Sequence, residues 1–128
     1  MDRGEKAIYR VAGVDPHLYR APHGKKTPWE LFHARRDNLA AVNWNISTNE
    51  LRTKDFETVA RNIVNKTRPG GIIDLHDGYG NDHGTPQADK SLTVKALPVI
   101  IEGLRDKGYS FETIPELLNL PAYNAAAR

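Results

Sequence analysis

Hydrophobic positions follow two different spacings along the chain, and these spacings predict strands that alternate with helices. Short apolar or alternating runs bounded by turn residues predict strands at 18–20, 39–46, 71–75 and 109–113. Apolar residues three and four positions apart, with helix start and stop signals, predict helices at 5–12, 27–38, 53–68, 91–107 and 115–118. The predicted fold class is therefore α/β, with about four parallel strands and crossover helices.

Signals at the helix ends support these assignments. Thr27, Pro28 and Glu30 form the pattern of a capping box, with proline at the first helical position. Thr53 is expected to cap the next helix, which Pro69 and the following glycines end. Pro98 lies inside the helix expected at 91–107 and predicts either a kink or a later start.

Composition narrows the function classes. The 128 residues carry 18 Lys and Arg against 16 Asp and Glu, and both signs are interspersed, which argues against a nucleic-acid partner. The chain has no cysteine, so any metal would need His, Asp or Glu ligands. No apolar run approaches the roughly 20 residues of a membrane span, and the first ten residues do not form a signal peptide. We expect one domain over 1–128, with a frayed tail at 119–128.

Polar segments follow the first three predicted strands, where α/β enzymes place their chemistry. The segments YRAPHG (19–24), NWNIST (43–48) and DLHDGYGN (74–81) resemble the last three motifs of the polysaccharide deacetylases, the NodB-homology domains of the carbohydrate esterases. The resemblance extends from about residue 6 to residue 118. It implies a partial (β/α) barrel and hydrolysis of N- or O-acetyl groups on a polysaccharide.

The first motif implies residues that orient the base and the oxyanion. By resemblance, Arg20 pairs with and orients the carboxylate that acts as general base. Pro22 fixes a loop in which the next backbone N–H, that of His23, helps to hold the oxyanion. A surface salt bridge that caps a loop is the alternative role for Arg20.

The other two motifs imply the acetyl pocket and the general acid. By resemblance, Trp44 and Leu75 wall the pocket for the acetyl methyl group, and His76 protonates the leaving amine. In the family, an aspartate three residues after the tryptophan tunes this histidine, but Ser47 occupies that position here. His76 is thus expected to lack its usual anionic partner. Trp44 is also suited to a core role, and His76 to a structural one.

The resemblance also implies a cofactor and a partner. The family uses a divalent metal, zinc or similar, held by residues of two motifs, TFDDG and H-S/T-x-x-H, that occur nowhere in these 128 residues. We therefore expect the C-terminal half of a domain, inactive alone. Such a half is expected to associate with a second copy or with the missing N-terminal half. The resemblance implies an acetylated polysaccharide as substrate and an extracellular or cell-envelope location.

Two alternatives remain open. The chain is otherwise a non-catalytic remnant or split half that binds carbohydrate or a partner chain. A different small α/β metal hydrolase would use His76, Asp77 and His83, with Asp82 nearby, although such clusters in glycine-rich loops are more often solvated turns. The substrate, the metal and the effect of Ser47 are not determined by the sequence.

Overall fold

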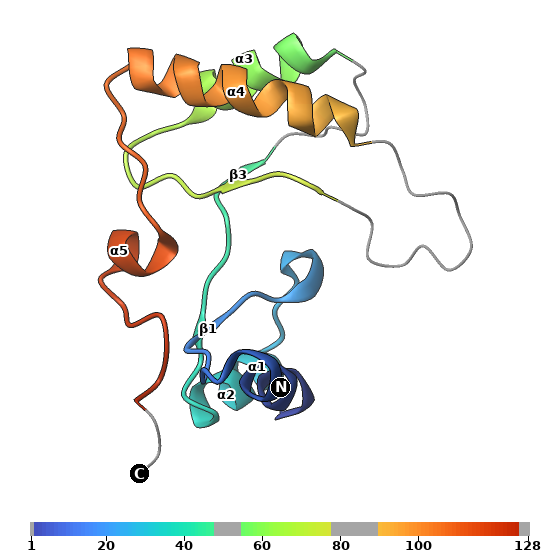
Figure 1. The fold of residues 1–128 in the computed structure, drawn as a ribbon, viewed down its shortest axis with the longest axis vertical. Coiled ribbons are helices and arrows are strands. Elements are labelled where there is room, and N and C mark those ends of the chain that lie inside the picture. Colours follow the sequence, from blue (N-terminus) through green and yellow to red (C-terminus); the bar gives the residue numbers. More distant parts are fainter. Residues whose placement is uncertain (1, 48–54, 78–89, 126–128) are drawn as a thin grey trace, which may run out of the picture. The chain divides into compact units, whose positions relative to one another are not determined.

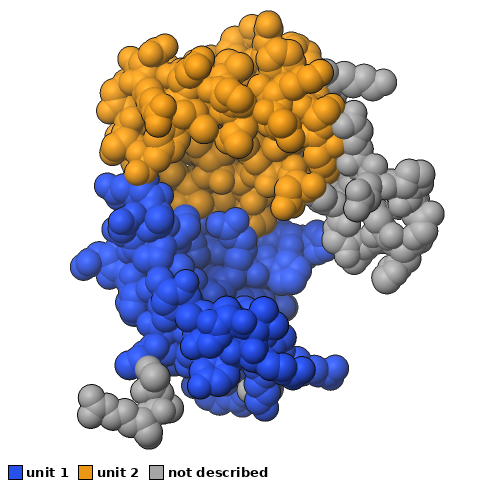
Figure 2. Space-filling model, in the orientation of Figure 1, with its two compact units in different colours: residues 1–43, 112–128 blue, residues 44–111 orange. Residues whose placement is uncertain are grey.

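The computed structural model describes residues 2–47, 55–77 and 90–125 (Figure 1). Contacts divide the chain into two compact units (Figure 2). Unit 1 comprises Met1–Asn43 and Glu112–Arg128, and unit 2 comprises Trp44–Phe111. A single domain over 1–128 stays a prediction. Across the described parts of the chain, no helix has both the length and the apolar character that a membrane crossing requires.

Unit 1 contains one strand–helix–strand crossover. Strand β1 (Leu18–Tyr19) leads through the 3-10 turn η1 (Pro22–Gly24) and helix α2 (Pro28–Arg36) to the parallel strand β2 (Ala40–Ala41). Helices α1 (Asp2–Ala12) and α5 (Ile114–Leu118) complete the unit. The predicted capping box of α2 is confirmed. The Thr27 N–H donates to Glu30 Oε2 over 2.7 Å, and the Glu30 N–H donates to Thr27 Oγ1 over 3.2 Å.

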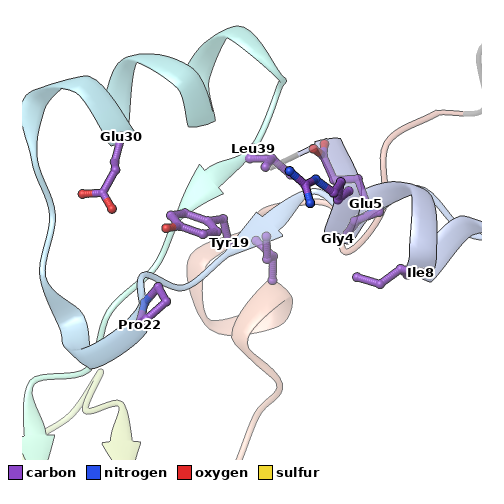
Figure 3. Close-up of a pocket in the computed structure, with 10 residues that line it drawn as sticks. Gly4, Glu5, Ile8, Tyr19, Pro22, Glu30 and Leu39 are labelled. Atoms are coloured by element: carbon purple, nitrogen blue, oxygen red, sulfur yellow. The ribbon is translucent and has the colours of Figure 1, made fainter. Parts of the chain in front are cut away.

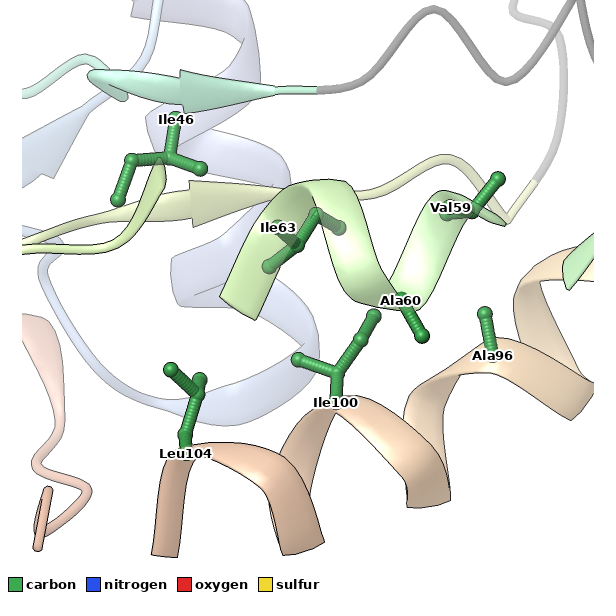
Figure 4. Packing of buried hydrophobic residues seen from close by; sticks show 7 residues of the cluster. All are labelled: Ile46, Val59, Ala60, Ile63, Ala96, Ile100 and Leu104. Atoms are coloured by element: carbon green, nitrogen blue, oxygen red, sulfur yellow. The ribbon is translucent and has the colours of Figure 1, made fainter. Parts of the chain in front are cut away.

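Unit 2 repeats this crossover and contains a buried core. Strand β3 (Ile46–Ser47), helix α3 (Phe56–Lys66) and strand β4 (Ile73–Asp74) form it, with β3 and β4 parallel. Helix α4 (Ser91–Asp106) packs against α3. The predicted apolar face of α3 is confirmed, because it supplies three members of the core shown in Figure 4: Ile46, Val59, Ala60, Ile63, Ala96, Ile100 and Leu104.

The strand expected at 39–46 is wrong in one respect, because it is two strands in two different sheets. Strand β2 pairs with β1, whereas β3 pairs with β4. Asparagines interrupt the run between them. The Asn43 side-chain amide donates to the Gly24 carbonyl over 3.2 Å, and Asn45 Oδ1 accepts from the Ile72 N–H over 2.9 Å. These side-chain bonds compete with a regular backbone ladder and end the first strand.

The strand expected at 109–113 is also wrong, since the structure has neither helix nor strand there. The Tyr109 N–H donates to the Leu104 carbonyl, which closes the end of α4, and the Tyr109 hydroxyl donates to the Thr67 carbonyl over 3.2 Å. Phe111 is 51% exposed. Alternation alone does not make a strand when the segment has no strand to pair with.

The helix ends of unit 2 differ slightly from the expectation. Asp55 caps α3 by accepting from the N–H groups of Glu57 and Thr58, each over 3.1 Å. The cap expected at Thr53 falls outside the described residues. Helix α4 continues through Pro98, although proline removes one hydrogen bond of the helix interior.

The expected frayed tail is anchored over its described part, residues 119–125. The Asn124 N–H donates to the Asp15 carbonyl over 2.9 Å, and its side-chain amide donates to the Pro16 carbonyl over 3.0 Å. Its Oδ1 lies 2.8 Å from His17 Nδ1 and accepts from the Asn38 side-chain amide over 2.6 Å. Side-chain hydrogen bonds of this kind are not visible in an Ala-rich tail sequence. Residues 126–128 fall outside the description.

Candidate active site

The first group of predicted site residues lies in unit 1, in the loop after β1. Arg20 is exposed, and Pro22 and His23 belong to the 3-10 turn. His23 has a left-handed backbone, with φ 56° and ψ 15°, which is uncommon for a residue other than glycine. The Gly24 N–H donates to the Ala21 carbonyl over 3.0 Å, and the Asn43 amide holds the Gly24 carbonyl. Hydrogen bonds at Ala21 and at Gly24 therefore fix the turn that carries Pro22 and His23.

A pocket of about 460 Å³ lies beside this loop in unit 1 (Figure 3). Pro22 is the one predicted site residue in its lining, to which α1, β1 and α2 also contribute. Glu30 at its wall is engaged in the capping box. The backbone N–H and then the hydroxyl of Thr27 donate to this carboxylate and hold its pKa below the usual 4.5. Glu30 therefore stays ionised near neutral pH and is unsuited to be a proton donor there.

The second group lies in unit 2. Leu75 and His76 directly follow β4, and Leu75 packs against the core cluster while His76 is exposed. Trp44 is half-buried and precedes β3 rather than following it. Because the ladder pairs Ile46 with Ile73, Trp44 lies toward the beginning of the β3–β4 pair and His76 beyond its end. The acetyl-pocket roles of Trp44 and Leu75 stay predictions.

The structure places a carboxylate beside His76 that sequence reasoning missed. Asp74 Oδ2 lies 3.8 Å from His76 Nδ1, within ion-pair distance. Ser47, which replaces the family aspartate, is paired with Asp74 across the parallel ladder. A signal was available in the sequence, because residues two apart along a strand point to the same face. An acidic residue in the apolar run GIIDL, two positions before a histidine, has this spacing.

The alternative metal site at the glycine-rich loop is not tested, because most residues of this loop fall outside the described part of the chain. Asp77 is exposed, and Asp82 and His83 fall outside the description. Among residues 2–47, 55–77 and 90–125, no group of three or more His, Asp or Glu side chains is arranged to hold a metal ion. The described residues thus do not fit a resident divalent metal.

Comparison with known sequences identifies relatives, although no protein-family model matches the chain. It is 30% identical over 105 residues to a chitooligosaccharide deacetylase of Bradyrhizobium sp. (strain ANU 289), covering 80% of this chain and 48% of the relative. It is 29% identical over 113 residues to a peptidoglycan-N-acetylglucosamine deacetylase of Bacillus cereus, covering 88% and 38%. The chain therefore spans half or less of the length of these relatives.

Solved structures share the fold. A peptidoglycan N-acetylglucosamine deacetylase, Bc1960, superposes with a TM-score of 0.82 at 27% identity, over 96% of this chain and 54% of that one. A family 4 carbohydrate esterase from Streptomyces lividans matches with a TM-score of 0.70 at 22% identity, over 88% and 53%. A family 4 pseudoenzyme from Bacillus anthracis matches with a TM-score of 0.76 at 20% identity, over 91% and 37%. The last two similarities concern the fold alone.

Proposed function

Because this chain is homologous to part of the polysaccharide deacetylases, we propose that it is one portion of a (β/α)-barrel hydrolase that removes N- or O-acetyl groups from a polysaccharide. The similarity to Bc1960 over 96% of the chain, at a TM-score of 0.82, carries this proposal. The relatives named above act on chitooligosaccharide and on peptidoglycan N-acetylglucosamine. An acetylated, N-acetylglucosamine-containing glycan at the cell envelope is therefore the substrate class that we propose.

In this proposal His76 is the general acid. A protonated imidazole donates its Nε2 proton to the nitrogen or oxygen of the sugar as the bond to the acetyl carbon breaks, and the ring becomes neutral. The exposed position of His76 after β4 supports this role, because the proton must reach a group on a bound polymer. The end of a parallel strand is also where α/β enzymes hold their catalytic groups.

The loop after β1 has a positioning role in this proposal. Arg20 would orient the carboxylate base, to which a guanidinium can donate two parallel hydrogen bonds. Pro22 and the left-handed His23 would aim the His23 N–H at the developing oxyanion, where a preorganised donor is most effective. Trp44 and Leu75 would wall the acetyl pocket.

The metal and the base would come from outside these 128 residues, either from another segment of a longer protein or from a partner chain. Exposed apolar side chains support an association surface in unit 1. On α1, Ile8 is 44%, Tyr9 62% and Val11 89% exposed. Short parallel strands also present unpaired backbone groups at their edges, which favour a neighbouring strand. Without the metal and base, the isolated chain is expected to be inactive.

A chimera tests the proposal. The matched 54% of Bc1960 would be replaced by this chain, so that the remainder of Bc1960 supplies what the chain lacks. We expect acetate release from chitin oligomers, and a loss of about 10²- to 10⁴-fold in kcat on His76→Ala. The same variant of His17, which bonds to Asn124, is the control for removal of an imidazole.

Three outcomes would contradict the proposal. A folded chimera that releases no acetate would favour the reading as a non-catalytic portion that binds carbohydrate or a partner. Equal rates for the His76→Ala and unmodified chimeras would remove His76 from the acid role. Acetate release by the isolated chain with added zinc, cobalt or nickel would show that it carries its own metal site.

A further inference from the structure

A largely buried carboxylate, that of Asp74, lies next to His76. Asp74 is the last residue of β4, and its side chain is 14% exposed, against 50% for His76. Its chain neighbours Ile73 and Leu75 pack against the apolar core of unit 2. Removing an ionised carboxylate from water is costly unless a positive or hydrogen-bonding partner compensates. The imidazole of His76, with Nδ1 at 3.8 Å from Asp74 Oδ2, is such a partner.

We propose that Asp74 is the positioning residue of His76. Its carboxylate accepts from the Nδ1–H group of the ring and leaves Nε2 directed to the substrate. This inference rests on the proposed role of His76 as general acid. Spacing supports it, since two residues that are two apart on an extended segment share a face. A separation of 3.8 Å is longer than a hydrogen bond, and such contacts in a free enzyme often shorten when substrate binds.

The pairing of β3 and β4 explains why the Asp74 carboxylate can replace the aspartate that the family has at the position of Ser47. Ser47 and Asp74 are partners in the register of β3 and β4, so their side chains leave the same face of the pair. Two carboxylates at paired positions would repel each other. A serine at 47 therefore removes a repulsion while Asp74 keeps one negative charge beside the histidine.

The positions of the protons before and after the step are consistent with this arrangement. The imidazolium carries protons on both nitrogens, with Nδ1–H facing Asp74. As the bond between the acetyl carbon and the sugar nitrogen breaks, the Nε2 proton passes to that nitrogen. The neutral ring keeps its Nδ1 proton toward Asp74, which remains ionised. A carboxylate that orients the ring and stabilises the imidazolium acts in this way in other acid–base sites.

The test measures where the neutral His76 ring carries its proton, using ¹⁵N NMR of the full chain at alkaline pH without substrate. The resonances of His76 are assigned by their loss in His76→Gln. We expect the Nδ1–H tautomer to predominate in the unmodified chain. In Asp74→Asn the ratio should reverse toward Nε2–H, because an amide N–H can donate to Nδ1. Asp77→Asn, which removes an adjacent exposed carboxylate, is the matched control and should leave the ratio unchanged.

The inference would be overturned by a predominant Nε2–H tautomer in the unmodified chain, a measurement that needs no variant to fold. It would also be overturned if Asp74→Asn had no effect, or if Asp77→Asn had the same effect. In the Bc1960 chimera, Asp74→Asn should lower kcat with KM unchanged, by less than the His76→Ala loss. An Nδ1–H tautomer together with an active His76→Ala chimera would instead show that the pairing is correct and the acid role is wrong.

Discussion

Gly71 lies where the turn after α3 enters β4, and we expect Gly71→Ala to destabilise unit 2. A Cβ at this position would lie 2.6 Å from Ile46 Cδ1 and 2.9 Å from the Arg68 carbonyl oxygen. Ile46 is a buried core residue, so its side chain has little room to turn away. The Arg68 carbonyl accepts the Gly71 N–H over 2.9 Å, so relieving that contact requires the backbone to move.

The size of the effect follows from two opposing contributions. Overpacking a filled core costs about 1–3 kcal/mol. Alanine also reduces the freedom of the unfolded chain, which stabilises by about 0.4–1 kcal/mol. The net loss should be about 1–2 kcal/mol, or a roughly 5- to 30-fold change in the folding equilibrium. Strands β3 and β4 carry Ser47 and Asp74, so the same displacement would disturb the surroundings of His76.

Native-state hydrogen exchange is the suitable assay, because it reports on each unit separately. The slowest amides of α3 and α4 should exchange about 5- to 30-fold faster in Gly71→Ala. Gly4→Ala is the control, since a Cβ there meets nothing within 4 Å. It lies inside α1 and should stabilise that helix by about 0.5–1 kcal/mol without effect on α3 and α4. Unchanged or slower exchange of α3 and α4 in Gly71→Ala would refute the reasoning.

Two further predictions concern stability. Ile63 is 0% exposed at the centre of the α3–α4 core, so Ile63→Ala should destabilise unit 2 by about 2–5 kcal/mol. Urea unfolding monitored by exchange or fluorescence measures this loss. A free energy of unfolding equal to that of the unmodified chain would contradict the packing described. Hydrogen bonds from the Thr58 hydroxyl and from the Glu57 and Thr58 N–H groups hold the pKa of Asp55 below its usual 3.8. A lowered pKa means that the stabilisation is present above pH 3.8 and is lost as the pH falls through the lower value of the folded state. Asp55→Asn should flatten the acid end of the stability profile, and an unchanged slope would oppose the cap assignment.

Interactions between near neighbours were predictable from the sequence. The capping box of α2 joins Thr27 to Glu30, three residues away, and needs no distant partner. The apolar face of α3 follows the helical repeat and appears as predicted, with Val59, Ala60 and Ile63 buried. The α/β class with parallel strands and crossover helices is likewise confirmed in each unit. The partial barrel stays a prediction, because over the described residues each unit contains one pair of short parallel strands.

The errors arise where a segment depends on a distant partner. The run 39–46 is apolar enough for one strand, but its halves pair with different strands and Asn45 bonds to Ile72 across 27 positions. Residues 109–113 alternate as a strand does, yet Tyr109 bonds to Thr67, 42 positions away, and no ladder forms. The tail is anchored through Asn124 to residues more than a hundred positions earlier.

The sequence by itself determined the order of helices, their caps and the three motifs that indicate a polysaccharide deacetylase, because these depend on residue type and short spacing. Only the tertiary structure decided which strands pair, and with them that Ser47 lies opposite Asp74. The register that sets Ser47 opposite Asp74 comes from the packing of Ile46 and its neighbours under α3 and α4. Strand pairing joins segments that are distant in the sequence. It depends on the buried area and the backbone hydrogen bonds of the whole unit, and a local sequence pattern does not carry this information.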